Sequence, residues 1–179
     1  MKIVETSLPG VLLLELDVHA DERGQFVELF NQARSEALGL PMHFVQDNVS
    51  RSRKGVLRGL HFQQPQPQGK LIQVLRGRIF EVAVDVRRGS PAFGRWVGVE
   101  MASEQNVQIW IPPGFAHGFC ALTDADVFYK CTSAYAPAHE RCLRWDDPRV
   151  GVAWPLRDPI LSAKDRAAPP LDEQKVLPP

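Results

Sequence analysis

Cysteine is scarce in this sequence. Its 179 residues contain three cysteines, Cys120, Cys131 and Cys142, an odd number with no Cys-x-x-Cys pair. They do not make a disulfide framework, and a chain of this length buries about 70% of the surface that it exposes when unfolded. The fold therefore needs neither disulfides nor a structural metal. We expect the three cysteines to be reduced, buried packing residues in strands.

Net charge and long hydrophobic runs are also absent. Lysine and arginine total 21, and aspartate and glutamate total 21. This balance excludes the broad basic patch that binds duplex nucleic acid or an anionic membrane, and it favours a small charged ligand bound by a few placed cations. The longest apolar run near the N-terminus, Val11 to Leu14, is too short for a signal or membrane-spanning segment. We expect a cytoplasmic protein.

Short strands dominate the pattern. Segments rich in Val, Ile, Phe and Tyr, most of them bounded by Gly, Pro, Asn or Asp, occupy residues 11–16, 26–30, 70–75, 79–86, 96–101, 107–111, 117–122 and 126–135. Eight or more strands at this spacing predict an all-β sandwich or barrel in a single domain, residues 1–179. In 79–86 one face is apolar and the other carries Glu81 and Asp85, which suits a barrel with a partly polar lumen.

Signals for helices are few. Asn31 can cap a short helix over 32–38, and Gly39 stands where a glycine would end it. From Asp146 onward, Asp-Pro and Trp-Pro pairs predict a segment that covers the barrel. The last ten residues or so read as a covering arm or a disordered tail.

The densest group of candidate site residues lies in GVLRGLHFQQPQPQGKL, residues 55–71. It places Arg58, His61 and Lys70 on adjacent strands joined by a Gln/Pro loop, which favours a site. A hairpin with surface cations is the alternative. Arg58 and His61 have opposite strand parity, so both face one pocket only if the strand twists or bulges, and Gly59 makes a bulge plausible.

A second candidate is the turn in WIPPGFAHGF, residues 110–119, which delivers His117 to the start of a strand. Its Pro-x-Gly-x-x-His pattern resembles the second half-motif of cupin jelly rolls. A metal-binding cupin also needs His-x-His and a nearby Glu, whereas this chain has His61, Phe62 and Gln63. Two lone histidines are too few ligands for a catalytic metal, so we predict no metal and no cofactor. His61 is then available as a general base.

Two N-terminal segments carry residues that could line a site. In DERGQFVELF a turn with Arg23 precedes a strand on which Phe26, Glu28 and Phe30 share one face. A surface salt bridge is the alternative for the Arg and the Glu. In FVQDNVSRS, residues 44–52, the side chains of Gln46 and Asn48 share strand parity and could present amides to a ligand, or could be ordinary outward polar residues.

Two C-terminal segments complete the candidates. In FYKCTSAY, Tyr129 and Tyr135 share parity on one strand, so both could point into the lumen. Buried tyrosines are usually just hydrogen-bonded, which is the alternative here. Asp165 of SAKD is an ordinary surface acid unless another group holds it.

The ordered set of motifs is more specific than any one of them. DERGQFVE, FVQDNVSRS, GVLRGLHFQ, GKL, FEVAVDVRRGSPAFG, WIPPGFAHGF, FYK…Y, W-x-D-D-P and LSAKD follow one another as in dTDP-4-dehydrorhamnose 3,5-epimerases. The resemblance runs from about Glu15 to Asp172. It implies a metal-free, homodimeric, cupin-type jelly roll with one or two short helices, acting in dTDP-L-rhamnose synthesis.

The resemblance also implies residue roles. His61 matches the catalytic base, Asp165 the acid that orients it, Lys70 the residue beside the 4-keto oxygen, and Tyr129 the proton donor on the opposite face of the sugar. The residues that match nucleotide-sugar contacts or pocket walls are Arg23, Phe26, Glu28, Gln46, Asn48, Arg58, His117 and Tyr135. The substrate would be the ketosugar nucleotide dTDP-4-dehydro-6-deoxy-D-glucose, and the product dTDP-4-dehydro-L-rhamnose. Ala134 departs from the family, which often has an aromatic residue there.

The chemistry agrees with these residue types. Carbons 3 and 5 both flank the 4-keto group, so removing either proton places negative charge on the same oxygen, where one Lys70 serves both steps. Inversion needs a base on one face and an acid on the other. A carboxylate bonded to the base fixes its tautomer and stabilises the imidazolium. The diphosphate requires cations, and Arg23 and Arg58 are candidates.

Other functions compete with this one. Relatives within the fold epimerise only carbon 3, or isomerise the ketosugar between carbons 3 and 4. A metal-dependent cupin dioxygenase is disfavoured by the missing His-x-His and Glu. A non-catalytic sugar-nucleotide binding barrel is disfavoured because it needs no His–Asp pair with a Lys and a Tyr around it.

Overall fold

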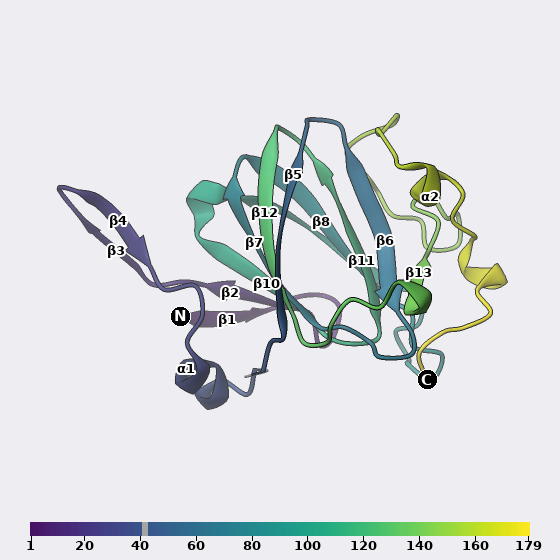
Figure 1. The fold of residues 1–179 in the computed structure, drawn as a ribbon, viewed down its shortest axis with the longest axis horizontal. Helices are drawn as coiled ribbons and strands as arrows, with labels where there is room; N and C mark the ends of the chain where they lie inside the picture. Colours follow the sequence, from purple (N-terminus) through teal and green to yellow (C-terminus); the bar gives the residue numbers. More distant parts are fainter. Residues whose placement is uncertain (41–42) are drawn as a thin grey trace.

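The computed structural model describes residues 1–40 and 43–179. Two antiparallel sheets form the body, and a two-stranded hairpin projects from it (Figure 1). The larger sheet has six strands in the order β1 (Lys2–Glu5), β2 (Leu12–Glu15), β10 (Val107–Ile111), β7 (Lys70–Arg76), β12 (Ala125–Cys131) and β5 (Gln46–Ser52). The smaller has five, in the order β13 (Glu140–Cys142), β6 (Leu57–Gln63), β11 (Phe115–Ala121), β8 (Arg78–Asp85) and β9 (Trp96–Ala102). The projecting hairpin pairs β3 (Val18–Asp21) with β4 (Gly24–Val27).

Helices are short, as the sequence predicts. Within residues 1–40 and 43–179 the α-helices are α1 (Gln32–Ala37) and α2 (Ala163–Arg166), and single 3₁₀ turns cover Ser103–Gln105, Pro137–His139 and Leu171–Glu173. Asn31 caps α1 by accepting a hydrogen bond from the Arg34 amide, and Gly39 follows it at φ +68°, both as expected. No helix in the described part of the chain is both long and apolar enough to cross a membrane.

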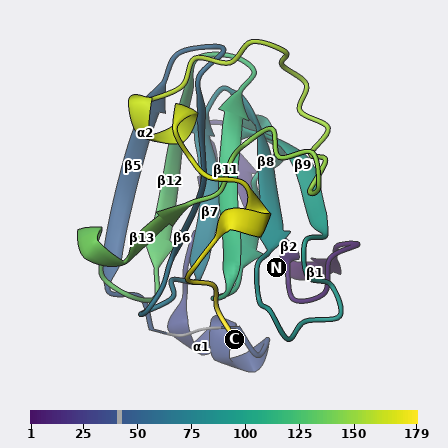
Figure 2. The ribbon, with the colours of Figure 1, turned by 90° about the vertical axis from the view of Figure 1, so that its right-hand side faces the viewer.

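Strand β8 contributes to two of the apolar clusters of the body, one on each of its faces. Ile79 and Ala83 pack between the two sheets, while Val82 and Val84 pack on the outer face of the smaller sheet. That outer face is covered by the C-terminal segment, which contributes Leu143, Val150 and Leu171 to the same cluster (Figure 2). Glu81 and Asp85 share the face of β8 that carries Ile79 and Ala83, and both acids are fully buried. Strand β8 therefore has an apolar side and a side with two acids, as the sequence indicates.

The C-terminal segment is held along its length. The backbone carbonyl of Pro178 accepts a hydrogen bond from the Arg88 amide, and the side chain of Gln174 donates to the Cys142 and Pro169 carbonyls. In the same segment, α2 lies against β6.

Two strand predictions need correction. The strand expected over 26–30 is instead β4, which ends at Val27. Phe30 therefore does not share a face with Phe26; it packs with Leu14 and Trp110 on the outer face of the larger sheet. The strand expected over 126–135 ends at Cys131, and at the next position the Gly69 amide donates to the Thr132 side-chain oxygen instead of to a backbone carbonyl. Alternation alone could not show where these strands stop pairing.

Candidate active site

The two sheets enclose a cavity of about 540 Å³, a size typical of small-molecule sites. Nine predicted site residues line it: Gln46, Asn48, Arg58, His61, Lys70, His117, Tyr129, Tyr135 and Asp165. Eight of them come from strands of the two sheets and from α2, and Tyr135 comes from the loop after β12. Residues of the wall that the sequence did not single out for the site are Ser50, Gln68, Ile72, Glu81, Phe119, Val127, Cys131, Glu140, Ser162 and Lys164.

A histidine and a carboxylate form a close pair at this cavity. His61 Nε2 lies 2.6 Å from Asp165 Oδ1. Asp165 is buried in the first turn of α2, where Ser162 caps the helix by accepting a hydrogen bond from the Asp165 amide. Burial alone would raise the pKa of Asp165, but the hydrogen bond and charge of His61 outweigh it and lower the pKa. Asp165 is thus an anionic hydrogen-bond partner of His61, fixed in position by that bond, rather than an ordinary surface acid.

A β-bulge brings Arg58 and His61 to the same cavity. His61 pairs with His117 and Arg58 with Phe119, so three steps along β6 oppose two along β11. Gly59 occupies the bulge at φ +126°, and a methyl group on it would lie 2.7 Å from the Gly118 Cα. The bulge inferred from strand parity is therefore present. Arg58 is held by donating from Nε to Ser52 Oγ at 3.0 Å.

Lys70 faces the dyad from the other sheet. The sequence interpretation placed Lys70 on a strand adjacent to that of Arg58 and His61, but β6 and β7 are consecutive only in the chain. They lie in opposite sheets, because the Gln/Pro loop crosses between them instead of making a hairpin. Burial lowers the pKa of Lys70 to about 8, although the nearby Cys131 and Glu81 act to raise it. The amine is still charged at neutral pH but poorly hydrated, so its field in the cavity is strong.

The two tyrosines differ more than their shared parity predicts. Tyr129 lies in the middle of β12, burial raises the pKa of its phenol, and no described residue hydrogen-bonds its hydroxyl group. Tyr135 lies beyond the end of β12, is 50% exposed, and donates its hydroxyl to Glu140 Oε2 at 3.1 Å. Tyr129 is therefore the phenol available inside the cavity, and Tyr135 lies at its rim.

The amide pair on β5 is arranged as predicted. Gln46 and Asn48 point to the same side, and Gln46 Nε2 donates to Asn48 Oδ1 at 2.9 Å. Gln46 Oε1 also accepts a hydrogen bond from the Tyr135 amide at 2.8 Å. These bonds fix the orientation of both amides on the cavity wall.

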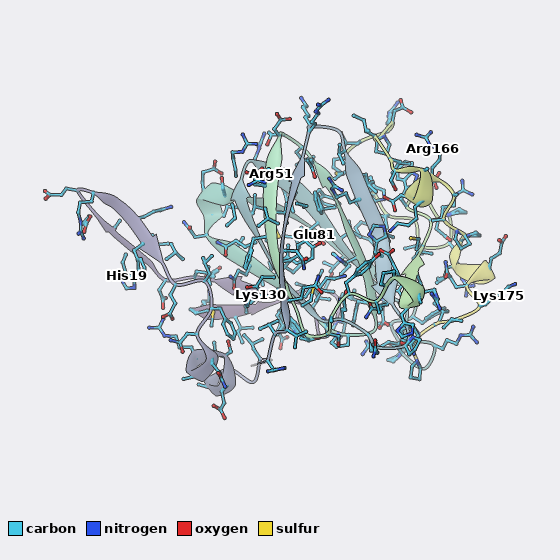
Figure 3. All side chains as sticks on the ribbon, in the orientation of Figure 1. His19, Arg51, Glu81, Lys130, Arg166 and Lys175 are labelled. Atoms are coloured by element: carbon cyan, nitrogen blue, oxygen red, sulfur yellow. The ribbon has the colours of Figure 1, made fainter. Side chains whose placement is uncertain are left out.

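Glu81 is the main residue missed in the sequence interpretation. It is fully buried, and its Oε1 lies 3.0 Å from His117 Nδ1. Figure 3 shows Glu81 between the two sheets. Burial raises the pKa of Glu81 well above its usual range and lowers that of His117 well below its own, so burial favours the neutral form of both groups. Which group donates across this contact depends on the His117 tautomer. The acidic face of β8 was the available sequence signal.

Three predicted contact residues lie outside this chain's own cavity. Arg23 and Phe26 are on the projecting hairpin, where Arg23 pairs with Asp21 and Phe26 is 68% exposed (Figure 1). Glu28 lies beside α1, paired with Arg34 at 3.3 Å. Within a single chain the structure does not bring these residues together with His61.

The fold and the site together define a class of protein. A jelly-roll barrel whose cavity holds a His–carboxylate pair, a desolvated amine and an unbonded phenol is equipped to move protons at a carbon next to a carbonyl group. This is an isomerase-type site on a cupin fold.

Comparison with known proteins identifies the family. Residues 5–173 match the family described as dTDP-4-dehydrorhamnose 3,5-epimerase. The chain is 54% identical over 169 residues to the enzyme of that name from Pseudomonas aeruginosa, covering 93% of each sequence, and 50% identical over 179 residues to that from Methanothermobacter thermautotrophicus, covering 98% of this chain and 97% of the relative. The crystal structure of the Legionella pneumophila epimerase with dTDP-4-keto-L-rhamnose superposes with a TM-score of 0.95 at 49% identity, over 99% of this chain and 97% of that one.

The chain belongs to the dTDP-4-dehydrorhamnose 3,5-epimerase family. The family, the cupin fold, the isomerase class and the epimerase function that the sequence predicts are confirmed. The alternatives of a metal-dependent dioxygenase and of a non-catalytic binding barrel are set aside.

Proposed function

We propose that the chain epimerises dTDP-4-dehydro-6-deoxy-D-glucose at carbons 3 and 5, with His61 as the base. Abstraction of either proton gives an enolate, and reprotonation from the opposite face gives the inverted centre. The observation that carries this proposal is the 2.6 Å contact between His61 Nε2 and the buried Asp165. It keeps the ring proton on Nε2, so the Nδ1 lone pair is free to accept a substrate proton, and the carboxylate stabilises the imidazolium that results.

Lys70 is proposed to stabilise both enolates. Carbons 3 and 5 share the 4-keto oxygen, so a single cation near that oxygen lowers the barrier to both proton transfers. Lys70 is buried on the wall opposite His61, and burial removes the water that would otherwise screen its charge.

Tyr129 is proposed as the acid that completes inversion. It projects from β12 of the larger sheet, whereas His61 projects from β6 of the smaller one. A sugar ring bound between the sheets would meet the base on one face and the phenol on the other. The phenol has no hydrogen-bond partner among the described residues, so its proton is free for transfer.

The remaining cavity residues are proposed to hold the nucleotide-sugar. Arg58, and His117 through an Nε2–H, are suited to bind the diphosphate. The fixed amides of Gln46 and Asn48 and the rim residue Tyr135 are suited to bind the neutral parts of the nucleotide-sugar. These contacts would orient the ring so that carbons 3 and 5 both reach His61.

We also propose a homodimer in which the hairpin of one chain reaches the cavity of the other. The hairpin stands away from its own barrel, and it leaves Phe26 exposed to solvent. The apolar strand β2 is covered by β1 on one side and β10 on the other, so the edge of the larger sheet at this end is β1. A partner could therefore receive both the edge and the hairpin. This would deliver Arg23, Phe26 and Glu28 to the nucleotide.

Proton NMR of the ketosugar nucleotide with the protein in deuterated water tests the reaction. Deuterium entry and inversion at both carbons are expected. Exchange and inversion at carbon 3 alone would contradict double epimerisation and indicate a 3-epimerase.

Mixing two defective variants tests the shared cavity. His61→Ala disables the cavity but not the hairpin, and Arg23→Ala/Phe26→Ala disables the hairpin but not the cavity. If the hairpin serves the partner, a mixed dimer contains one intact site, and activity rises well above that of either variant alone. No rise after subunit exchange, or a mass of one chain by light scattering, would contradict the proposal.

A further inference from the structure

We propose that Cys142, His61 and Asp165 form a binding site for a thiophilic divalent cation such as Zn²⁺, and that the bound cation inhibits epimerisation. The metal site stands on geometry alone, while its inhibitory effect rests on the proposed role of His61 as base. Cys142 was expected to be a packing residue, but it is only half-buried and lies beside the dyad.

Three separate elements bring the ligand atoms together. Cys142 on β13 is the register partner of His61 on β6, and such cross-strand partners project to the same side of a sheet. Asp165 reaches the same point from the first turn of α2. One ligand atom of each residue lies within 4.8 Å of the other two. A shift of about 1 Å would bring all three within the bonding distances of zinc.

The donor set suits zinc better than a hard cation. A thiolate, an imidazole nitrogen and a carboxylate oxygen are its usual ligands, and three protein donors with a water molecule complete a tetrahedral site. Two anionic ligands would neutralise the charge of the ion. The neighbouring cation Lys164 is already paired with Glu140 at 2.8 Å, which limits its repulsion of a metal.

Binding at Nε2 would remove the base without touching the substrate side of the ring. In the metal-free pair the ring proton is on Nε2 and is donated to Asp165. A metal takes the Nε2 lone pair, so the neutral ring must carry its proton on Nδ1 instead. The thiol of Cys142 loses its proton to solvent as sulfur binds the ion. Nδ1 then has no lone pair to accept the proton from carbon 3 or carbon 5.

Zn²⁺ titration of the chelator-treated enzyme provides the first test. We expect epimerisation to fall as Zn²⁺ is added, to return on addition of EDTA, and binding to release about one proton per ion, as measured by calorimetry in buffers of different ionisation enthalpy. Binding of Co²⁺ can be measured without an activity assay, because a thiolate bound to Co²⁺ gives a charge-transfer absorption in the near ultraviolet.

Cys142→Ser is the decisive variant, because serine keeps the size of the side chain and removes the thiolate. It should keep the basal activity, lose the cobalt–sulfur band, and need at least ~10-fold more Zn²⁺ for half-inhibition, since changes even outside the ligand shell weaken sites by about 10–100-fold. Cys120→Ala, which removes a thiol outside the cluster, should behave as the wild type.

Two results would overturn the proposal. One is a cobalt–sulfur band that persists in Cys142→Ser, and the other is equal Zn²⁺ sensitivity of Cys142→Ser and the wild type. Neither result would contradict the proposed role of His61 as base. That role is tested separately, by measuring deuterium exchange with the His61→Ala variant in metal-free buffer.

Discussion

His61 and His117 are paired across β6 and β11. One ring nitrogen of each histidine contacts a carboxyl group, but the pKa values of the two carboxyl groups are shifted in opposite directions. His61 Nε2 contacts Asp165, whose pKa is lowered because the bond and charge of His61 outweigh the effect of burial. His117 Nδ1 contacts Glu81, whose pKa burial raises. One histidine therefore has an anionic partner that stabilises its protonated form, while burial favours the neutral form of the other histidine and of its partner.

Removing the base should stop every step of the reaction. We expect His61→Ala to abolish deuterium exchange as well as inversion, with a loss of at least ~10²–10⁴-fold in rate. Asp165→Asn is the graded comparison, because it keeps the shape but cannot stabilise the imidazolium, so exchange should be slow but measurable. NMR in deuterated water measures both. Exchange at the wild-type rate in His61→Ala would show that another group is the base.

Removing the acid should separate exchange from inversion. Tyr129→Phe leaves His61 and Lys70 intact, so enolates still form and a proton can return to the face that it left. We expect continued deuterium incorporation with strongly reduced inversion, most severe at carbon 5. The same NMR assay reports both quantities. Inversion of both centres at the wild-type rate would make Tyr129 a wall residue only.

The pH dependence should report the charge on Lys70. Its pKa of about 8 means that the amine is charged below this pH and neutral above it. We expect kcat to fall as the pH rises through about 8, because an uncharged amine no longer stabilises the enolate. Lys70→Arg keeps its charge to a much higher pH, so any activity that it retains should lack this decline. An identical alkaline limb in Lys70→Arg would assign it to another group.

The bulge glycine should matter for stability. Gly59→Ala places a methyl group 2.7 Å from the Gly118 Cα at a φ of +126°, so we expect a loss of about 1–3 kcal/mol. Thermal unfolding would show a drop of about 2–4 °C for each kcal/mol in a chain of this size. Gly89→Ala is the matched control, since nothing lies within 4 Å of its added methyl group. Equal melting temperatures for the two variants would refute the strain argument.

Chelation should leave the enzyme active. The first half-motif lacks the His-x-His and Glu of metal-binding cupins, and each histidine of the cavity is already bonded to a carboxyl group. We expect full activity after prolonged treatment with EDTA and dialysis. Activity that disappears on treatment and returns with a divalent ion would contradict the metal-free mechanism.

Local pattern predicted those parts of the site that depend on one strand at a time. The shared face of Gln46 and Asn48, and the bulge required by Arg58 and His61, both follow from the two-residue period of a strand. The role of Asp165 could be assigned only from the family resemblance. It lies 104 residues from His61 in the chain, and no periodicity reports a contact over that separation.

The misplaced residues share a different cause. The alternation around Phe26 indicates a strand but not its partner, so it could not show that β4 pairs only with β3 and leaves the barrel. Likewise, the acids of β8 indicated a polar lumen, but the contact of Glu81 with His117 depends on β8 pairing with β11. In both cases the missing information was strand pairing between distant segments.

The position of α2 sets the order in which this site can be assembled on the ribosome. The strands that carry His61, Lys70 and Tyr129 all end by Cys131, so they can pair while the C-terminal segment is still being synthesised. Asp165 arrives later, on the segment that then packs beside β6. A nascent or prematurely terminated chain can therefore build the cavity without the carboxylate that bonds to its histidine.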